Sequence, residues 1–252
     1  MPHLTQDIKR FEEISNNGWP ALQTMQYDGW LLRFAEGVTK RSNSVTMLYP
    51  SRIPFKEKIA FCETVYHQRG IAPCFKIVGE SGTSVIDNIL EDQGYSIPAT
   101  ISFQMVTIAH TPPAPKQDVR IETRINEAWI DHFIRMNRFE KSRKPVYLAI
   151  MKQMLTPKCL VSVVANQQTI GVGLGVLEAD CIGLFDLVVD PDHRNKGIGA
   201  DIVKAILHWG HAMGANKGYL QVLTDNTQAI SVYRKFGFAE VYQYWYRMKQ
   251  ES

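Results

Sequence analysis

The chain has 252 residues, of which 45% are hydrophobic and 21% are charged, a composition typical of one large globular domain or two small ones. Five Trp, ten Tyr and eleven Phe supply apolar area for a core, which excludes disorder over most of the chain. The formal charge of +3 is small and evenly spread, so neither nucleic acid nor a membrane surface is indicated as a partner. No apolar run approaches the roughly 18 residues of a membrane span. Residues 1–7 lack the pattern of a secretion signal, and we expect a cytoplasmic protein.

The cysteines form no close pair and have no metal-ligand spacing, so no metal site is expected. In a reducing compartment they are most simply interpreted as small, buried apolar residues. The four are Cys62, Cys74, Cys159 and Cys181.

In the N-terminal half, Trp30, Leu32 and Phe34 alternate with other residues, which predicts a strand over 30–35. Two interpretations of its large side chains stay open. In the favoured one, Trp30 and Arg33 pack a domain interface, because tryptophans are usually structural. In the other, Trp30, Arg33 and Asn43 line a pocket for a polar acceptor.

Further along the chain, a helix is expected over 56–68, a break at Gly70 and a strand over 71–78. A short helix over 85–92, the pair Gly94-Tyr95 and a strand ending near Met105 follow. Three prolines between positions 112 and 115 can sustain neither a helix nor a central strand. We therefore expect two domains, 1–109 and 119–252, joined by a proline-rich linker over 110–118.

The C-terminal half is more regular. Asn126 is expected to cap a helix over 127–134, and a second helix should run over 145–155. Strands over 159–165 and 169–177 form a hairpin, and a strand over 182–189 follows. A helix over 199–213, a strand over 219–222, a helix over 227–236 and a strand over 238–248 complete the series.

A strand–helix–strand crossover requires a parallel pair inside an otherwise antiparallel sheet. The fold class expected is α/β (α+β), with a mixed, mostly antiparallel sheet flanked by helices. The order helix, glycine, strand, helix, glycine, strand occurs in both halves, with glycines at 70 and 94 and again at 214 and 237. We interpret this as an internal repeat of architecture.

The motif that carries chemistry lies between the strand over 182–189 and the helix that follows. After Asp190-Pro191 come Arg194-x-x-Gly197-x-Gly199 and the helix. Glycines allow the backbone to approach a ligand, and the unpaired N–H groups of a first helical turn attract an anion. Walker and Rossmann motifs do not fit. The competing interpretation is a glycine-containing turn with incidental basic residues.

This motif resembles the pyrophosphate-binding signature of the GNAT superfamily of acetyl-CoA-dependent N-acetyltransferases. A second match, Asn226-x-x-Ala229-x-x-x-Tyr233-x-x-x-Gly237-Phe238, resembles the family's loop and helix beside the thioester. The resemblance covers residues 119–250. Over the first half it rests only on the repeated order of elements, which implies a degenerate GNAT-like repeat that no longer binds the cofactor.

The resemblance implies acetyl-CoA as cofactor and a role for each matched residue. Backbone groups of Leu187 and Val189 would pair with the pantetheine arm, and an N–H near Val189 would polarise the thioester. Asn226 would position the cofactor or its own helix. The cofactor-binding residues so implied are Leu187, Val188, Val189, Arg194, Asn195, Lys196, Gly197, Ile198, Gly199, Ala200 and Asn226.

Two catalytic residues are predicted. Tyr233 would protonate the departing thiolate, the alternative being a core aromatic. Asp186 is the nominee for general base, because a carboxylate inside a strand needs a reason to be there. Glu178 and Asp180 are alternatives that could reach the same cleft, and ordered water is a third.

The sequence thus predicts an N-acetyltransferase in which an amine attacks acetyl-CoA directly in a ternary complex, since no cysteine falls in a matched catalytic position. A non-catalytic acyl-CoA sensor or scaffold is the alternative, and another acyl donor is a further one. The expected acceptor is a small molecule that bears an amine, with amino acids, antibiotics and protein N-termini all open. A homodimer is left open.

Overall fold

The structure, a computed structural model, describes residues 5–79 and 84–249. Residues 1–4, which belong to the segment without a secretion-signal pattern, lie outside the described residues. Residue 250, the last one that the family resemblance covers, lies outside them too. The chain forms two compact units: an N-terminal unit of residues 1–102 and 242–252, and a C-terminal unit of residues 103–241. This division differs from the predicted one at 109 and 119. The proline-rich segment lies within the C-terminal unit, and two long strands each begin in one unit and end in the other.

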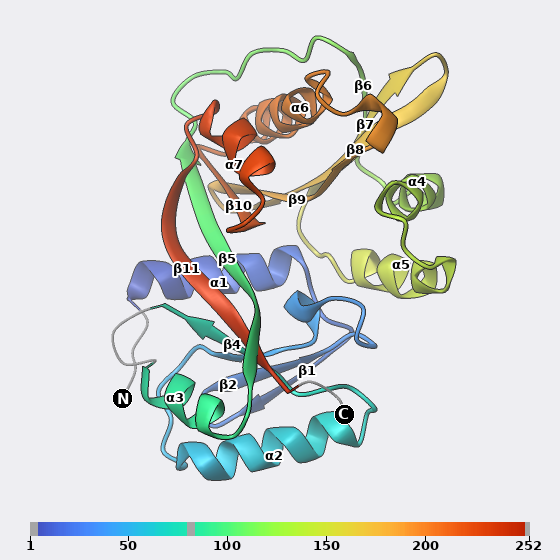
Figure 1. Cartoon of the computed structure of the whole chain (residues 1–252). Helices are drawn as coiled ribbons and strands as arrows, with labels where there is room; N and C mark the ends of the chain where they lie inside the picture. The colour runs from blue at the N-terminus through green and yellow to red at the C-terminus, as the bar shows by residue number, and fades with distance from the viewer. Residues whose placement is uncertain (1–4, 80–83, 250–252) are drawn as a thin grey trace. The chain divides into compact units, whose positions relative to one another are not determined.

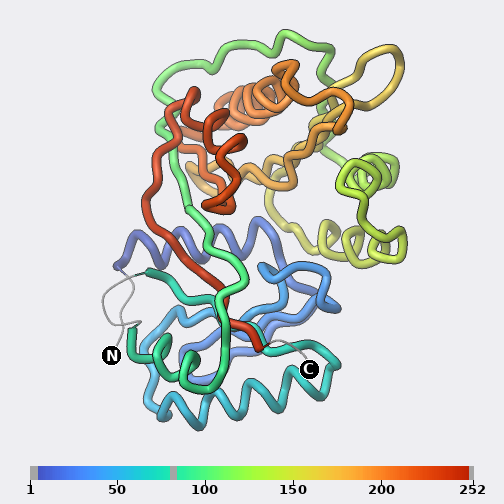
Figure 2. Tube along the Cα trace, in the orientation of Figure 1, coloured from blue at the N-terminus to red at the C-terminus, as the bar shows by residue number. Residues whose placement is uncertain are grey.

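These strands are β5 (Ser96–Thr107) and β11 (Ala239–Met248), whose course along the chain can be followed in Figure 2. Each follows a short helix, β5 after α3 (Ser84–Asp92) and β11 after α7 (Thr227–Arg234). The order helix, strand, helix, strand therefore occurs twice, as the sequence predicted. In the first half it comprises α2 (Phe55–His67), β4 (Cys74–Val78), α3 and β5.

The sheet of the N-terminal unit has the strand order β1-β2-β3-β4-β11-β5 (Figure 1). Its remaining elements are α1 (Gln6–Gly18), β1 (Gln23–Tyr27), β2 (Trp30–Phe34), η1 (Lys40–Ser42) and β3 (Val45–Met47). Strands β3 and β4 are parallel, and β1–β2, β2–β3 and β4–β11 are antiparallel. The strand predicted over 30–35 is β2, whereas α1, β1 and β3 were not predicted.

One face of this sheet is apolar. Trp30, Leu32, Val45 and Phe75 pack there with residues of α2 and α3. The other face is buried but charged: Lys76 of β4 forms an ion pair with Glu12 of α1, with an Nζ–Oε2 distance of 2.6 Å. Because a buried charge is costly unless it is paired, α1 is needed to complete this face.

Arg33 also belongs to the charged face. Its side chain donates hydrogen bonds to the carbonyl oxygens of Asn16, Trp19 and Arg41 and to Asn16 Oδ1, and the residue is only 1% exposed. Asn43 is equally buried and holds the loop after β2 through the N–H groups of Ala35 and Gly37. These contacts favour a packing role for Arg33 and Asn43, here within the N-terminal unit, over a pocket for an acceptor.

The C-terminal unit has the strand order β5-β10-β9-β8-β7-β6. Strands β9 (Cys181–Val189) and β10 (Lys217–Leu223) form the expected parallel pair, and β9–β8, β8–β7 and β7–β6 are antiparallel. The other elements are β6 (Asp118–Glu122), α4 (Glu127–Asn137), η2 (Lys141–Arg143), α5 (Lys144–Lys152), β7 (Lys158–Ala165), β8 (Gln168–Glu178), η3 (Pro191–His193) and α6 (Ile198–Ala212). Most predicted bounds agree within three residues, and Asn126 caps α4 through the N–H of Ala128.

A glycine stripe on β8 explains how closely α6 packs on this sheet. A Cβ at Gly173 would lie 2.4 Å from Ile202 Cγ2, and one at Gly171 would lie 2.8 Å from Ile198 Cγ2. Side chains at these positions would push α6 away from β8. The intervening Val172 points to the opposite face, where α4 contacts the sheet (Figure 1).

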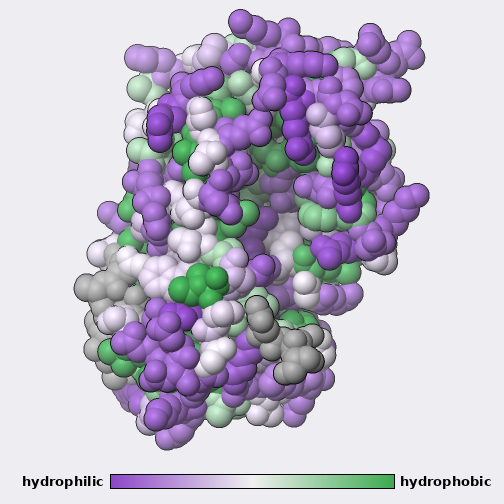
Figure 3. Space-filling view, viewed as in Figure 1, coloured by the Kyte–Doolittle hydropathy of each residue, from purple (hydrophilic) through white to green (hydrophobic). Residues whose placement is uncertain are grey.

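On the face viewed in Figure 3, hydrophilic residues cover most of the surface and the apolar ones are scattered. Within the described part of the chain, no helix has the length and apolar character needed to span a membrane.

Candidate active site

Strands β9 and β10 of the C-terminal unit separate towards one end. Their parallel pairing runs from Cys181↔Lys217 to Leu184↔Leu220, while β9 continues to Val189 against β8 alone. Asp190 donates to the carbonyl of Ile170 on β8 with an N–O distance of 2.9 Å. Since N–H directions alternate along a strand, the backbone groups of Leu187 and Val189 face the side that β10 has left. These are the two residues predicted to pair with a pantetheine arm.

A β-bulge lies at the point of separation. The register between β8 and β9 shifts between Val172 and Leu174, and Asp186 has a φ of 53°. Aspartate and asparagine are the side chains that tolerate this left-handed region best. Asp186 therefore has a structural reason to occupy its position, in addition to the predicted role of general base. It is half-buried and lies beside the open stretch of β9.

The loop after β9 leads into α6 through residues with positive φ, 62° at Asn195 and 81° at Gly197. Gly197 is the N-terminal cap of α6, and a Cβ built there would meet no atom within 4 Å. Across residues 5–79 and 84–249, no acceptor is found for the backbone N–H groups of residues 195–200. Six consecutive amides thus surround the start of α6 without a hydrogen-bond acceptor, which is the arrangement that binds an anion.

The side chains of this loop are exposed. Arg194 Nε lies 3.4 Å from the carbonyl oxygen of Val189, and Lys196 Nζ lies 3.2 Å from that of Asp192. Asn195 Oδ1 accepts a hydrogen bond from Gln228 Nε2 of α7 at 2.8 Å. Both basic groups are placed to add countercharge beside the free amides.

Two residues that sequence reasoning missed hold this loop. Arg135 of α4 donates to Asp190 Oδ2 at 2.6 Å and to the carbonyl of Thr169. The Arg135 guanidinium keeps the pKa of Asp190 below its usual value, assisted by the N–H of Asp192. Gln228 is the second. Arg135 lies outside the recognised motifs and Gln228 occupies a variable position within one, so neither was singled out, and each acts through a contact between distant segments.

Asn226 and Tyr233 lie at the two ends of α7. The side-chain oxygen of Asn226 accepts from the N–H of Ala229 at 3.1 Å, so it positions its own helix. The Tyr233 ring packs edge-on against Phe238, with ring centroids 6.0 Å apart. Burial raises the pKa of Tyr233 to about 12. The structure gives its hydroxyl no hydrogen-bond partner among the residues it describes.

Glu178 and Asp180 lie towards the other end of β9, which supports them less than Asp186 as candidate bases. Glu178 pairs with Cys181 at the start of β9, whereas the open stretch is at the end of that strand. At about 3.3 Å per residue, the strand carries them some 25 Å away from Val189. Asp180 is instead paired with Lys217, with an Oδ2–Nζ distance of 3.1 Å.

All four cysteines are free thiols and fully buried, as the sequence predicted. Burial raises the pKa of Cys62, Cys74 and Cys159 to about 12. A protonated, buried thiol is a poor nucleophile. Within the described residues, no group of three or more His, Cys, Asp and Glu side chains is placed to hold a metal ion.

A parallel strand pair that separates at a bulge, followed by a glycine-containing loop with free amides at a helix start, defines the GNAT class of N-acetyltransferases. The model of the family described as "Probable histone acetyltransferase Rv0428c C-terminal" matches residues 5–247. The chain belongs to this family of GNAT-type N-acetyltransferases.

The relatives agree with this assignment. The "Uncharacterized N-acetyltransferase YobR" of Bacillus subtilis (strain 168) is 29% identical over 249 residues, which are 97% of this chain and 99% of the relative. A GCN5-related N-acetyltransferase from Kribbella flavida has a TM-score of 0.69 at 13% identity and covers 100% of this chain and 98% of that one. A tandem GNAT protein from the clavulanic acid biosynthesis pathway has a TM-score of 0.59 at 11% identity, covering 96% and 88%. The two structures show the fold, which is a tandem GNAT fold.

Proposed function

We propose that the C-terminal unit transfers an acetyl group from acetyl-CoA to an amine that attacks directly in a ternary complex. The observation that carries the proposal is the run of six backbone amides at residues 195–200 without an acceptor, next to the exposed edge of β9. Membership of a GNAT family supports the reaction class. The buried cysteines favour direct attack over a covalent acyl-enzyme.

The residues present fit coenzyme A. Amides 195–200, with Arg194 and Lys196, would hold the pyrophosphate, and Gly197 leaves space where a side chain would otherwise project. Leu187 and Val189 would bind the amide-rich pantetheine arm as an added strand. When bound, acetyl-CoA supplies an activated thioester. Val188 pairs with Val172 of β8 and so holds the open edge of β9 in the sheet. Asn226 caps α7 by accepting a hydrogen bond from the N–H of Ala229.

The chemistry requires a stabilised oxyanion, a neutral amine and a proton donor for sulfur. The N–H of Val189 faces the open edge and would serve the developing oxyanion. Asp186, three residues earlier at the bulge, would accept the proton of the attacking amine. Tyr233 carries its proton at neutral pH, as an ordinary tyrosine does, and its hydroxyl would donate towards the departing sulfur.

For the acceptor we propose a small molecule bearing an amine. The family description names histones, but a chain with a formal charge of +3 gives no long-range attraction to a strongly basic histone tail. A screen of small amines, amino acids and a histone-tail peptide, with release of free thiol as the readout, compares these acceptors directly.

Thermal shifts with coenzyme A, acetyl-CoA and ATP test the cofactor. We expect both CoA compounds to raise the melting temperature, since a ligand that binds only the native state stabilises it, and ATP to have less effect. The variant Gly197→Leu should lose the shift, because a Cβ at a φ of 81° is strained and fills the space left for the ligand. No shift with any CoA compound well above micromolar concentration would refute the proposal. A shift without acetyl transfer to any amine would favour the sensor or scaffold.

A further inference from the structure

The N-terminal unit contains a second strand–loop–helix connection of the same topology. Strand β3 is followed by residues 48–54, helix α2 and the parallel strand β4. In the C-terminal unit β9, residues 190–197, α6 and the parallel strand β10 follow in the same order. Residues 48–54 therefore correspond to the loop whose amides face no acceptor in the C-terminal unit.

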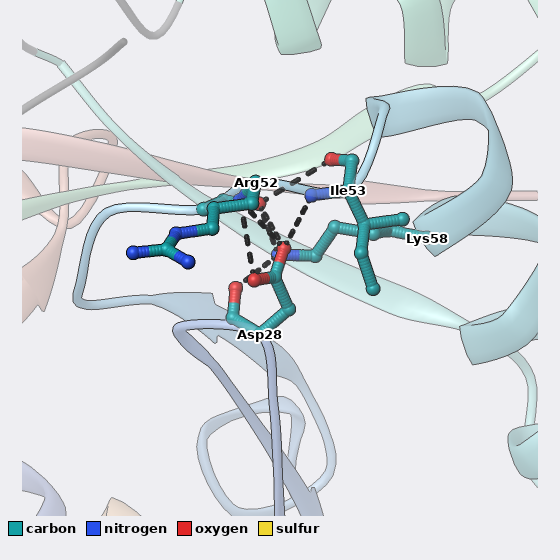
Figure 4. Close-up of polar contacts among 5 residues, drawn as sticks. Asp28, Arg52, Ile53 and Lys58 are labelled. Carbon is teal, nitrogen blue, oxygen red and sulfur yellow. Dashed lines mark hydrogen bonds and ion pairs between the residues drawn. The ribbon is translucent and has the colours of Figure 1, made fainter.

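In the N-terminal unit the loop amides already have an acceptor. Asp28 Oδ2 accepts hydrogen bonds from the N–H of Arg52 at 2.9 Å, the N–H of Ile53 at 2.8 Å and the hydroxyl of Ser51 at 2.6 Å (Figure 4). The Ser51 hydroxyl, with the Ile53 amide, holds the pKa of Asp28 well below its usual value despite partial burial. The carboxylate is bound as an anion.

A buried cation completes the site. Lys58 of α2 is 0% exposed, and its Nζ lies 3.2 Å from Asp28 Oδ2 and 2.6 Å from Ser51 Oγ (Figure 4). The ammonium also lies over the face of the Trp30 ring, with Nζ 4.1 Å from the ring centroid, which is a cation–π contact. A buried ammonium requires a countercharge. Two backbone amides, a hydroxyl and an ammonium are together the donor set with which proteins bind phosphate and carboxylate groups.

A short hairpin brings Asp28 to this loop. Asp28 and Gly29, with φ of 42° and 82°, form a two-residue turn between β1 and β2. Trp30, two positions after Asp28, pairs with Met47 at the end of β3. The corresponding residue in the C-terminal unit, two positions before the Gly171 that pairs with Val189, is Thr169. It carries no charge.

We propose that the loop between β3 and α2 is an oxyanion site, and that the chain fills this site with its own Asp28 carboxylate. By topology it is equivalent to the cradle of the C-terminal unit, by which we mean the free amides of residues 195–200 and the open edge of β9. Two consequences follow. The N-terminal unit keeps two loop amides, a hydroxyl and an ammonium as donors, and its own Asp28 carboxylate occupies them, although Pro54 at the N-cap of α2 offers no N–H where α6 has Gly197. Removal of the Asp28 side chain exposes a site for a small free oxyanion, such as formate or inorganic phosphate. The inference does not depend on the reaction proposed for the other unit.

The test is chemical rescue of Asp28→Gly in the full-length chain. Glycine tolerates the positive φ, and the deletion leaves Lys58 and the two amides without their acceptor. We expect a lower melting temperature than wild type in chloride and a saturable rise of several degrees with formate or phosphate at matched ionic strength. Wild type should show no saturable rise with formate beyond its response to chloride, and a rise with phosphate that arises at residues 195–200 of the C-terminal unit should be common to wild type and variant and is subtracted. If the variant does not fold, the refolding yield in formate against chloride gives the same comparison.

Two controls make the result specific. Asp28→Asn fills the space with a neutral group of similar shape and should be destabilised but not rescued. Asp131→Ala removes an exposed carboxylate paired with Lys144 on the protein surface and should show no rescue beyond chloride. Equal responses of Asp28→Gly and Asp131→Ala to formate, or no response of Asp28→Gly in either melting or refolding, would overturn the proposal.

Discussion

Tyr233 is half-buried against the core of the C-terminal unit, and its hydroxyl has no hydrogen-bond partner among the described residues, so the hydroxyl is available to donate to a ligand. In Tyr233→Phe we expect kcat to fall by about a hundredfold, a typical size for acid–base catalysis, with the Kd for coenzyme A unchanged. A steady-state assay of thiol release measures kcat, and a calorimetric titration measures the Kd for coenzyme A. A kcat equal to that of wild type would assign the ring to packing alone.

Asp186→Asn is the matched variant for the proposed general base. Asparagine also tolerates a φ of 53°, so the bulge and the melting temperature should be retained while the carboxylate is lost. We expect a fall in kcat with little change in cofactor affinity. If the rate is retained, the side chain serves the backbone of the bulge, and ordered water is the better candidate for the base.

At the scale of elements, the close packing of α6 on β8 depends on Gly173. In Gly173→Ala the added Cβ would lie 2.4 Å from Ile202 Cγ2, and we expect destabilisation of about 1–3 kcal/mol in denaturant unfolding. Ile202→Ala removes the atom that is hit, so the same glycine substitution should cost less in that background. An equal cost in both backgrounds would show that the clash is not its origin.

The same glycine stripe supports the candidate site. Strand β8 pairs with β9, and α6 begins at the free amides of residues 195–200. A displacement of α6 from β8 would therefore change the position of these amides relative to the open edge of β9. Variants of Gly173 should for this reason weaken cofactor binding as well as stability. A substitution of Gly197 differs from one of Gly173, because its side chain would meet the ligand and no other part of the protein.

At the scale of the whole molecule, several carboxylates have lowered pKa values in the folded state. Hydrogen bonds from Ser51 and Ile53 lower that of Asp28, and Arg135 lowers that of Asp190. Burial acts to raise the pKa of Asp87, but hydrogen bonds from Arg247 and Trp245 outweigh it. A lowered folded pKa stabilises the protein above the unfolded value near 4, and this contribution is lost as the pH falls through the folded value.

Unfolding by denaturant should therefore be nearly independent of these groups between pH 5 and 7 and become easier below about pH 4. The variant Asp28→Asn should show a shallower loss of stability with acid, since one proton fewer is taken up on unfolding. The unfolding midpoint as a function of pH checks both statements. An unchanged acid slope in Asp28→Asn would contradict the lowered pKa of Asp28.

The sequence alone determined those features that local patterns encode. Helix caps, glycine breaks and alternating strands located most elements, and the loop after β9 was recognised because its glycines and basic residues lie together in the chain. Among the elements missed in the first half, β3 is only three residues long and β1 is largely exposed, so both carry weak patterns. Helix α1 was overlooked although Thr5 caps it and it has 13 residues. Only the tertiary structure decided how distant segments meet. The exchange of β5 and β11 between units, the separation of β9 from β10, the Arg135–Asp190 contact and the filling of the first loop by Asp28 all depend on hydrogen-bond register and long-range contacts, whose energies no local sequence pattern records.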